Sequence, residues 1–351
     1  MPWPGLLVSE AVPTPWLFEF FHSLGGAERH DPDAIQRHYD WYLDLWVAAE
    51  QRGFEGIFFS EHHFGAAYSP SPHLLIVAVA QRTSTLRLGV LGAATPYSTP
   101  WRVVEEFGML DHLTRGRLEA GVVSGIPPEY ALVGLEPAEA LERHEEILDV
   151  LALARLDGSV TYKGRHWELD GVELLPRPLQ QPLPVWTASR SIESARRAGA
   201  RGLKVCFGFL STAELAELAA AYRESADAAS HPSGAEQIAI RRLVNLVDDA
   251  GARSEAKRQT RRDLYDLLVR SAGDLPPWAA LLDAPDFSDG PVSEDEFVAG
   301  TTKQVTEELL AQCDAVGAGH AVVCFSPTRP PEIERVHALF AEEVLPALRA
   351  G

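Results

Sequence analysis

Short apolar runs alternate along the chain with longer segments in which apolar residues recur every three or four positions. The short runs predict strands that are buried on both faces, as in a parallel sheet, and the longer segments predict amphipathic helices. Strands are predicted at residues 5–12, 56–64, 86–94, 118–125, 184–188, 203–209, 238–247 and 320–325. Helices are predicted at residues 33–51, 70–82, 100–113, 137–155, 191–200, 212–226, 252–272, 303–315 and 333–348.

This alternation predicts an α/β fold, a single (β/α)8 TIM barrel that spans residues 1–351 as one domain. No Gly/Ser/Pro-rich linker divides the chain into two domains. The alternative is a doubly wound open sheet, which should carry a glycine-rich phosphate turn after its first strand, whereas residues 10–15 contain no glycine.

Three segments depart from the strand and helix alternation. Residues 16–21 are aromatic and are predicted to form a covering loop after the first strand. Residues 160–169 predict a small hairpin with a turn at Lys163 and Gly164. Residues 273–300 are rich in Pro, Asp and Gly and predict a lid-like insertion before the eighth strand.

The segment from Gly53 to Gly65, GFEGIFFSEHHFG, places ionisable side chains at the carboxyl end of the second predicted strand, the end that carries the chemistry in parallel barrels. Neighbouring strand residues point to opposite faces, so His62 should project to one side and Glu61 and His63 to the other. A metal site is disfavoured, because adjacent histidines do not both point inward. A single inward His62 suits acid or base catalysis, while a structural role stays open.

Two other strand ends carry candidate binding groups. The third strand ends in GVLGAATPYSTP, where Gly89 and Gly92 would let a flat ligand approach the backbone or would simply permit tight packing. The fifth strand ends in TASRSIES, where Ser189, Arg190 and Ser191 offer hydroxyls, a guanidinium and helix-start N–H groups to a phosphate. The alternative is a helix cap, although Ser194 in place of Glu makes an imperfect capping box.

Arg115 and Arg117 form a small basic group in LTRGRLEAG, but they precede the fourth predicted strand. They should therefore lie at the face of the barrel that serves stability and not catalysis. Glu105 or Glu106 on the preceding helix is the expected partner.

The net charge of -19 excludes classes of partner that need a basic surface, such as nucleic acid and anionic membranes. The three cysteines, Cys206, Cys313 and Cys324, are widely spaced and predict buried thiols in a reducing compartment. No basic and apolar leader opens the chain, and no run approaches 18 apolar residues. These features predict a soluble cytoplasmic protein without a bound metal.

The chain resembles the bacterial luciferase-like family of flavin-dependent monooxygenases. The resemblance covers about the first two hundred residues well and the remainder in architecture only. Its most specific part is the long pattern P-x-R-x-x-E-x-x-x-L-D-x-L-T-R-G-R-x-x-x-G. The matching residues are SEHHFG at 60–65, the stretch 88–125, Glu129, Gly134, Glu142, Arg143 and PVWTASRSIESA at 184–195.

The resemblance implies a role for particular residues. It makes His62 the catalytic imidazole and places a non-proline cis peptide, behind the flavin ring, at Leu91–Gly92. A family arginine that contacts phosphate is replaced by Ser124, and the reactive cysteine of luciferase is replaced by Val123, which excludes thiol chemistry there. The remaining phosphate contacts map onto Arg143, Ser189, Arg190 and Ser191.

The function implied is a two-component monooxygenase in which a separate flavin reductase supplies reduced FMN, and O2 adds to give a 4a-hydroperoxyflavin that oxygenates a small apolar or aldehyde-like substrate. A homodimer is expected from the resemblance alone. Two alternatives stay open. One is hydride transfer with a deazaflavin coenzyme, and the other is a non-catalytic flavin-binding barrel.

Overall fold

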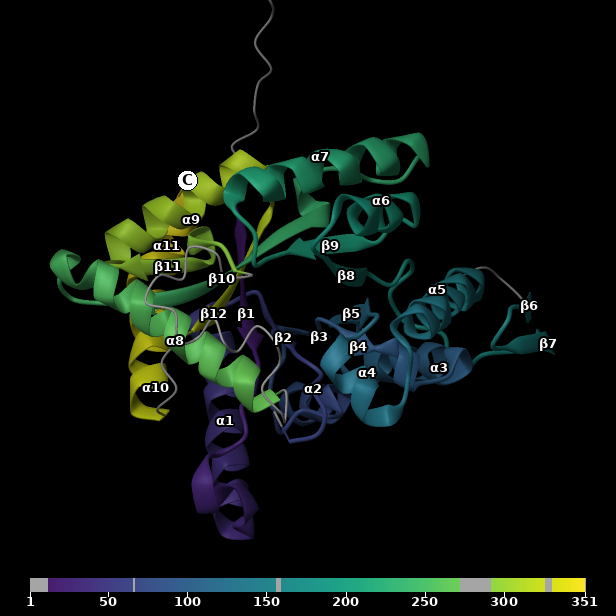
Figure 1. Ribbon diagram of the computed structural model, residues 1–351, viewed down its shortest axis with the longest axis horizontal. Helices are drawn as coiled ribbons and strands as arrows, with labels where there is room; N and C mark the ends of the chain where they lie inside the picture. Colours follow the sequence, from purple (N-terminus) through teal and green to yellow (C-terminus); the bar gives the residue numbers. More distant parts are fainter. Residues whose placement is uncertain (1–11, 66, 156–158, 272–291, 326–329, 351) are drawn as a thin grey trace, which may run out of the picture.

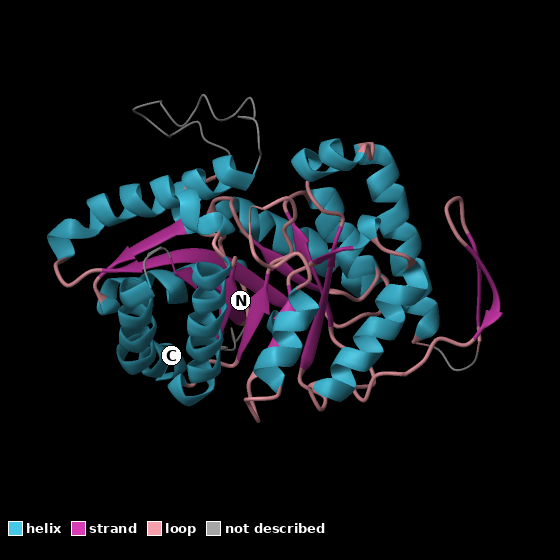
Figure 2. Cartoon of the chain, turned by 90° about the horizontal axis from the view of Figure 1, so that it is seen from below, coloured by secondary structure: helices cyan, strands magenta, loops and turns pink. Residues whose placement is uncertain are grey.

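The computed structural model describes residues 12–65, 67–155, 159–271, 292–325 and 330–350. Its centre is a closed barrel of eight parallel strands that neighbour one another in chain order, with helices around them (Figures 1 and 2). Strand β10 pairs with both β9 and β12, and β12 pairs with β1, which closes the sheet. The predicted (β/α)8 barrel is confirmed. The barrel strands are β1 (Thr14–Glu19), β2 (Gly56–Phe59), β3 (Arg87–Val90), β5 (Leu118–Val123), β8 (Val185–Ser189), β9 (Lys204–Phe207), β10 (Ile238–Leu246) and β12 (His320–Phe325).

The helices begin and end where local signals in the sequence place them. Proline near the first position starts α1 and α3, and Gly53, in the left-handed region at φ 86°, ends α1. The helices are α1 (Pro32–Arg52), α2 (Pro72–Ala80), α3 (Pro100–Leu113), α4 (Pro127–Val133), α5 (Pro137–Ala154), α6 (Ile192–Ala200), α7 (Thr212–Ala228), α8 (Arg253–Ser271), α9 (Thr302–Val316), α10 (Pro330–Leu339) and α11 (Leu345–Ala350).

Aromatic side chains in contact with one another fill part of the barrel interior. Trp16, Phe58 and Trp186 are each at most 2% exposed, and the ring centroid of Phe58 lies 4.9 Å from Trp16 and 5.4 Å from Trp186. A Cβ atom at Gly89 would lie only 2.7 Å from the Phe58 ring and 2.4 Å from Glu119 O. Of the two roles considered for Gly89, the structure therefore supports tight packing.

The first strand differs from its prediction. Residues 5–11 lie outside the described residues, and β1 occupies Thr14–Glu19, within the stretch predicted as an aromatic loop. Pro13 and Pro15 suggested a loop, but Pro15 stands near the start of a strand that pairs along both edges with β12 and β2. The aromatic residues of this segment therefore line the barrel interior and its mouth.

The structure also tests the predictions for residues 160–169 and for part of residues 273–300, the other two segments that depart from the alternation. The predicted hairpin is confirmed, since β6 (Val160–Lys163) and β7 (Glu168–Val172) form an antiparallel pair that projects from the barrel (Figure 1). Residues 272–291 of the predicted insertion lie outside the described residues. Its final residues are not a loop, because β11 (Phe297–Gly300) pairs in parallel with β10.

Arg117 is structural, as its position before the fourth strand predicted, but its expected partner was wrong. Its guanidinium is buried and donates hydrogen bonds to Leu86 O at 2.8 Å and Ala80 O at 3.0 Å. Glu106 instead pairs with Arg102 and His73. The arginine therefore ties together main-chain carbonyls of the segment from the end of α2 to the start of β3.

Candidate active site

A cavity of about 500 Å³ opens at the carboxyl ends of the barrel strands. This volume lies within the range of about 300–1,000 Å³ that is usual for small-molecule sites, and this end of a barrel carries the catalytic residues of such enzymes. The lining residues come from most of the strand ends and from the helices beside them. They include Phe18 and Phe20 at the end of β1, Glu61 and His62 after β2, Leu91 and Gly92 after β3, Val123, Ser124 and Glu129 at and after the end of β5, His144 and Leu148 on α5, Ser189 and Arg190 at the end of β8, Ser194, Arg197 and Arg201 on and just after α6, Cys206 and Phe209 at and after the end of β9, and Arg241 on β10.

The imidazole of His62 lines this cavity and is held by a buried carboxylate. Its Nδ1 lies 3.2 Å from Oε1 of Glu129, and the same oxygen accepts the backbone N–H of His63 at 3.1 Å. Burial raises the pKa of Glu129, but the hydrogen bonds and charges of His62 and His63 outweigh it and leave the pKa below its usual value. An ionised carboxylate only accepts hydrogen bonds, so Nδ1 carries the proton and Nε2 is left to exchange one.

His63 is not part of the cavity wall. Its Nε2 lies 3.0 Å from Oε1 of Glu61, and its ring packs edge-on against Tyr97. The hydrogen bond to Glu61 raises the pKa of His63, which favours an ion pair. The predicted division between His62 and His63 therefore holds. Its basis was wrong, because β2 ends at Phe59 and these residues follow the strand, so Glu61 also lines the cavity.

The start of α6 is more fully capped than its sequence suggested. Ser191 Oγ accepts the N–H of Ser194, and Ser194 Oγ accepts the N–H of Ser191, so the capping box is complete. Ser189 Oγ lies 2.6 Å from Ser194 Oγ. A serine at the third helical position can therefore replace Glu, and the imperfect-cap argument was wrong. The hydroxyls of Ser189 and Ser194 still line the cavity, whereas Ser191 lies beside it.

The other predicted cofactor residues divide into two groups. Leu91, Gly92, Ser124 and Arg190 line the cavity, and the Leu91–Gly92 peptide is cis, as predicted. Arg143 is not among the lining residues. Its Nη2 lies 2.5 Å from Oε1 of Glu139, and its Nε is buried without a hydrogen-bond partner among the described residues.

Several charged residues of the cavity, among them Glu129, Arg197, Arg201 and Arg241, were not singled out by sequence reasoning. Glu129 was noted as part of the family pattern but without a role, although the Pro-Pro pair before it signals a new helix, α4, directly after the fourth strand. Arg241 stands in IAIRRLVNL, and an arginine inside so apolar a strand was the available signal.

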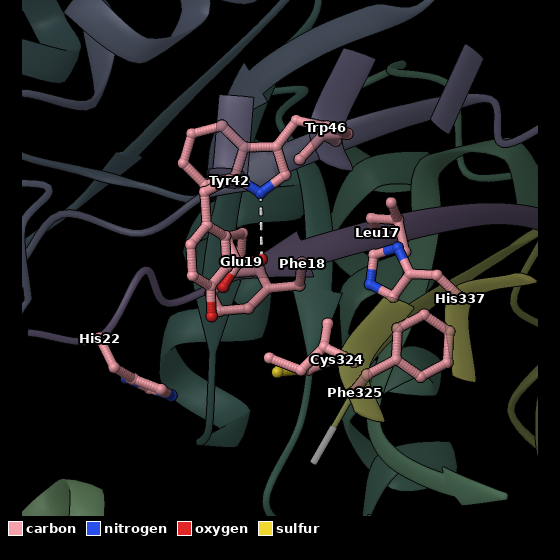
Figure 3. A pocket seen from close by; sticks show the side chains of 11 residues that line it. Leu17, Phe18, Glu19, His22, Tyr42, Trp46, Cys324, Phe325 and His337 are labelled. Carbon is pink, nitrogen blue, oxygen red and sulfur yellow. Dashed lines mark hydrogen bonds between the residues drawn. The ribbon is translucent and has the colours of Figure 1, made fainter. Parts of the chain in front are cut away.

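A second cavity, of about 20 Å³, lies between β1, α1 and α10 (Figure 3). Its volume suffices for about one water molecule and not for an organic ligand. The carboxyl group of Glu19 faces it and accepts hydrogen bonds from Trp46 Nε1 at 3.1 Å and from Phe21 N at 3.0 Å. Burial raises the pKa of Glu19. This group therefore joins the end of β1 to α1 and is separate from the larger cavity.

The sequence pattern of the luciferase-like monooxygenase family matches residues 18–322. The chain belongs to this family. An uncharacterised protein of Sinorhizobium fredii is 34% identical over 302 residues, which cover 83% of this chain and 85% of the relative. Limonene 1,2-monooxygenase of Rhodococcus erythropolis is 27% identical over 80% of this chain and 73% of its own. The oxygenase component of a flavin-dependent trigonelline monooxygenase of Acinetobacter baylyi is 29% identical over half of each chain.

Solved structures of other oxidoreductases share the fold. The monooxygenase RslO1 of Streptomyces bottropensis superposes with a TM-score of 0.79 at 23% identity, over 94% of this chain and 99% of its own. The oxygenating constituent of 3,6-diketocamphane monooxygenase of Pseudomonas putida, in complex with FMN, gives 0.71 at 20% identity, over 95% and 98%. An F420-dependent secondary alcohol dehydrogenase gives 0.74 at 19% identity, over 96% and 99%. The same fold therefore occurs in a protein that binds FMN and in one that depends on F420.

No helix among the described residues is long and apolar enough to cross a membrane. In the same part of the chain, no group of three or more His, Cys, Asp or Glu side chains could hold a metal ion. All three cysteines are buried and unpaired. Burial raises the pKa of each of these thiols to about 12, so they are poor nucleophiles.

Proposed function

We propose that this protein is the oxygenase component of a two-component monooxygenase that uses reduced FMN, delivered by a separate flavin reductase, and O2. The observation that carries the proposal is the placement of His62, held by the buried carboxylate of Glu129, in the wall of a cavity that also includes the Leu91–Gly92 peptide and the hydroxyl groups of Ser189 and Ser194. An acid or base group, a flat apolar wall and hydroxyl donors are what flavin chemistry with O2 requires of a protein.

The residues present fit FMN. A cavity of about 500 Å³ has room for a flavin beside a small substrate. The backbone of Gly92 forms part of its wall, and a Cβ atom there would lie 2.9 Å from Val122 N, so only glycine fits at this point of the wall. Ser124, Ser189 and Arg190 would hold the phosphate. Ser191 would contribute through the helix start, and Arg143 would contribute once its guanidinium leaves Glu139.

Reduced FMN, when bound, supplies the electrons that activate O2. The protein supplies a proton and a dry site. His62, with Nδ1 fixed by Glu129, would give a proton from Nε2 to the reduced oxygen and take one back after substrate oxygenation. Phe18 and Phe20 line the cavity with apolar rings and exclude water from this position. Trp16 and Tyr97 do not line this cavity, because they pack respectively in the barrel interior and against His63.

Titration of the purified protein with FMN and, separately, with F420 tests the cofactor. We expect binding of FMN, and oxidation of photoreduced FMN by O2 in the presence of the protein alone, followed by multiple turnovers once a flavin reductase and NADH are added. Binding of F420 without FMN would replace the proposal by hydride transfer. Binding of FMN with no change in its reaction with O2 would indicate a non-catalytic barrel.

The variant His62→Ala tests the catalytic group. It should abolish substrate oxygenation and leave the dissociation constant for FMN within about twofold, because the ring contributes a proton and not the main binding contacts. His30→Ala is the matched control, since His30 is exposed at the end of the short 3-10 helix Gly26–His30 and is not among the residues that line the cavity. Unchanged turnover in His62→Ala would remove His62 from the mechanism.

We also propose that the protein acts as a homodimer in the cytoplasm, where reduced FMN and its reductase are present. The surface of α2 and α3 supports the dimer, because Leu74 is 72% exposed and Met109 is 52% exposed on these two neighbouring helices. Apolar side chains gathered on one surface are typical of a contact between subunits. Light scattering of the purified protein measures the assembly directly.

A further inference from the structure

Arg241 lies on the interior face of β10, between two apolar residues of that face. Strand alternation places Ala239, Arg241 and Leu243 of β10 on the interior face, and both neighbours belong to the interior hydrophobic cluster. The side chain of Arg241 is only 5% exposed and lines the large cavity. A charged group so deeply buried requires a partner that compensates the loss of water.

The described residues compensate this charge only in part. Glu296 is fully buried and forms close ion pairs with both Arg241 and the neighbouring Arg242, so one carboxylate serves two guanidinium groups. The carboxylate also accepts the N–H of Phe209 at 2.7 Å. Nη1 of Arg241 is buried and has no hydrogen-bond partner among the described residues. The cluster therefore keeps an excess positive charge and a free donor beside the cavity.

Aromatic rings surround this guanidinium. Its Cζ lies 4.2 Å from the ring centroid of Phe209, 5.7 Å from Phe18 and 5.9 Å from Phe20. A second guanidinium, Arg190, lies 5.0 Å from the Phe209 ring and adds positive charge at the cavity wall. The rings exclude water and hold the Arg241 fork in place, which strengthens its attraction for an anion that enters the cavity.

The ring of Phe20 lies close to both Arg241 and His62, the candidate catalytic residue. The ring centroids of Phe20 and His62 lie 6.1 Å apart and the two rings are stacked, whereas Cζ of Arg241 lies 5.9 Å from Phe20. A small molecule resting on Phe20 would therefore reach His62 with one end and Arg241 with the other. Of the residues proposed above to bind the flavin phosphate, Ser124 and Ser189 belong to other strand ends, whereas Arg190 shares the Phe209 ring with Arg241.

We propose that the substrate carries a carboxylate on an apolar or aromatic body, and that Arg241 binds this carboxylate. This inference rests on the proposed monooxygenase function and specifies its substrate class. The planar guanidinium fork matches a carboxylate, and the flanking rings of Phe18 and Phe20 accept the apolar body. A purely structural role for Arg241 would leave its unpaired Nη1 unexplained. Glu296 does not need Arg241 as a partner, because Arg242 and the N–H of Phe209 already bind its carboxylate.

Paired ligands that differ only in charge test the proposal. Isothermal titration of the FMN-bound protein would compare benzoate with benzamide, phenylacetate with phenylacetamide, and octanoate with octanamide. We expect the wild-type protein to bind each acid about 10–100-fold more tightly than its amide, as a charge-assisted hydrogen bond in a buried site predicts. Equal affinity for acids and amides would overturn the proposal.

Three variants assign the preference to Arg241. Arg241→Gln should bring the affinities for each acid and its amide to within about twofold of one another. Arg241→Lys keeps the charge but loses the planar fork, and should retain part of the preference for acids. Arg262→Gln is the matched control, because it removes a positive charge from the exposed face of α8 and should keep the full preference. A full preference in Arg241→Gln would also overturn the proposal. If that variant does not fold, the wild-type comparison and Arg241→Lys decide.

The flavin measurements separate this inference from the proposed function. The wild-type protein should bind FMN and oxidise photoreduced FMN whether or not an acid is present, since neither step needs the substrate carboxylate. If those activities are present and the acids show no preference, the substrate assignment alone is wrong. If the protein binds neither FMN nor F420, the proposed function fails, and titration of the flavin-free protein still shows whether Arg241 selects carboxylates.

Discussion

The variant Glu129→Gln tests the arrangement on which the proposed chemistry depends. The change preserves the size of the side chain and leaves a carbonyl oxygen to accept the N–H of His63, but it removes the negative charge 3.2 Å from Nδ1 of His62. The protonated form of His62 then loses its counter-charge. We expect the reaction of bound reduced FMN with O2 to slow, because negative charge that develops on oxygen is neutralised by a proton from His62.

The size of the effect follows from the contact. Two unit charges 3.2 Å apart at an effective dielectric constant of about 20 attract by about 5 kcal/mol, which is an upper bound. The His62 side chain is 24% exposed, so solvent weakens this attraction. Replacing a charged hydrogen-bond acceptor by a neutral one costs about 1–2 kcal/mol, and each 1.4 kcal/mol corresponds to about tenfold. The rate constant should therefore fall about 5–30-fold.

Stopped-flow oxidation of photoreduced FMN at a known O2 concentration measures this rate without an organic substrate. Glu136→Gln is the control, because Glu136 precedes α5, is exposed and makes no capping hydrogen bond. A double-mutant cycle supplies the decisive comparison, since Glu129→Gln should have no further effect in a His62→Ala background. An equal loss with and without His62, or a wild-type rate in Glu129→Gln, would refute the proposed coupling.

Three further predictions concern stability and assembly. Burial lowers the pKa of His337 to about 3, so the folded protein keeps the ring neutral while the unfolded chain takes up a proton below pH 6.5. The free energy of unfolding should therefore fall as the pH drops from about 6.5 toward 3, by at most about 1.4 kcal/mol per pH unit from this group. The variant His337→Phe should flatten this dependence of the unfolding free energy on pH, as measured by urea denaturation. Gly108→Ala should destabilise by about 3 kcal/mol, because its Cβ would lie 1.8 Å from Pro176 O, whereas Gly25→Ala, with no atom within 4 Å, should cost less than about 0.5 kcal/mol; equal melting temperatures would contradict this packing. Met109→Glu should convert the proposed dimer to monomer in light scattering, and a monomeric wild type would exclude the dimer.

Much of the fold could be predicted because its signals are local. Residues 100–113 were predicted as a helix and residues 320–325 as a strand, and the structure has α3 and β12 at these positions. Proline at a helix start and a bounded run of apolar residues in a buried strand act through neighbouring residues only. The first strand was misplaced because its prolines signal a loop locally, while pairing with β2 and β12 decides the outcome.

The candidate site was predictable in part. His62 was identified, because its position after a buried strand and its family pattern are both visible in the sequence. Its partner Glu129 lies 67 positions away, on a short helix that was not predicted. The complete cap at Ser191 depended on the side-chain geometry of Ser194, which the residue types alone did not specify.

The sequence by itself determined the alternation of strands and helices, the barrel that this alternation implies, and the strand end that bears His62, because periodicity and helix caps depend on residues close together in the chain. Only the tertiary structure decided which charges meet. It placed Glu129 against His62, shared Glu296 between Arg241 and Arg242, and left Arg241 facing the cavity. Closure of the barrel brings these distant strand ends together, and the energy of a buried charge depends on neighbours that sequence separation does not reveal.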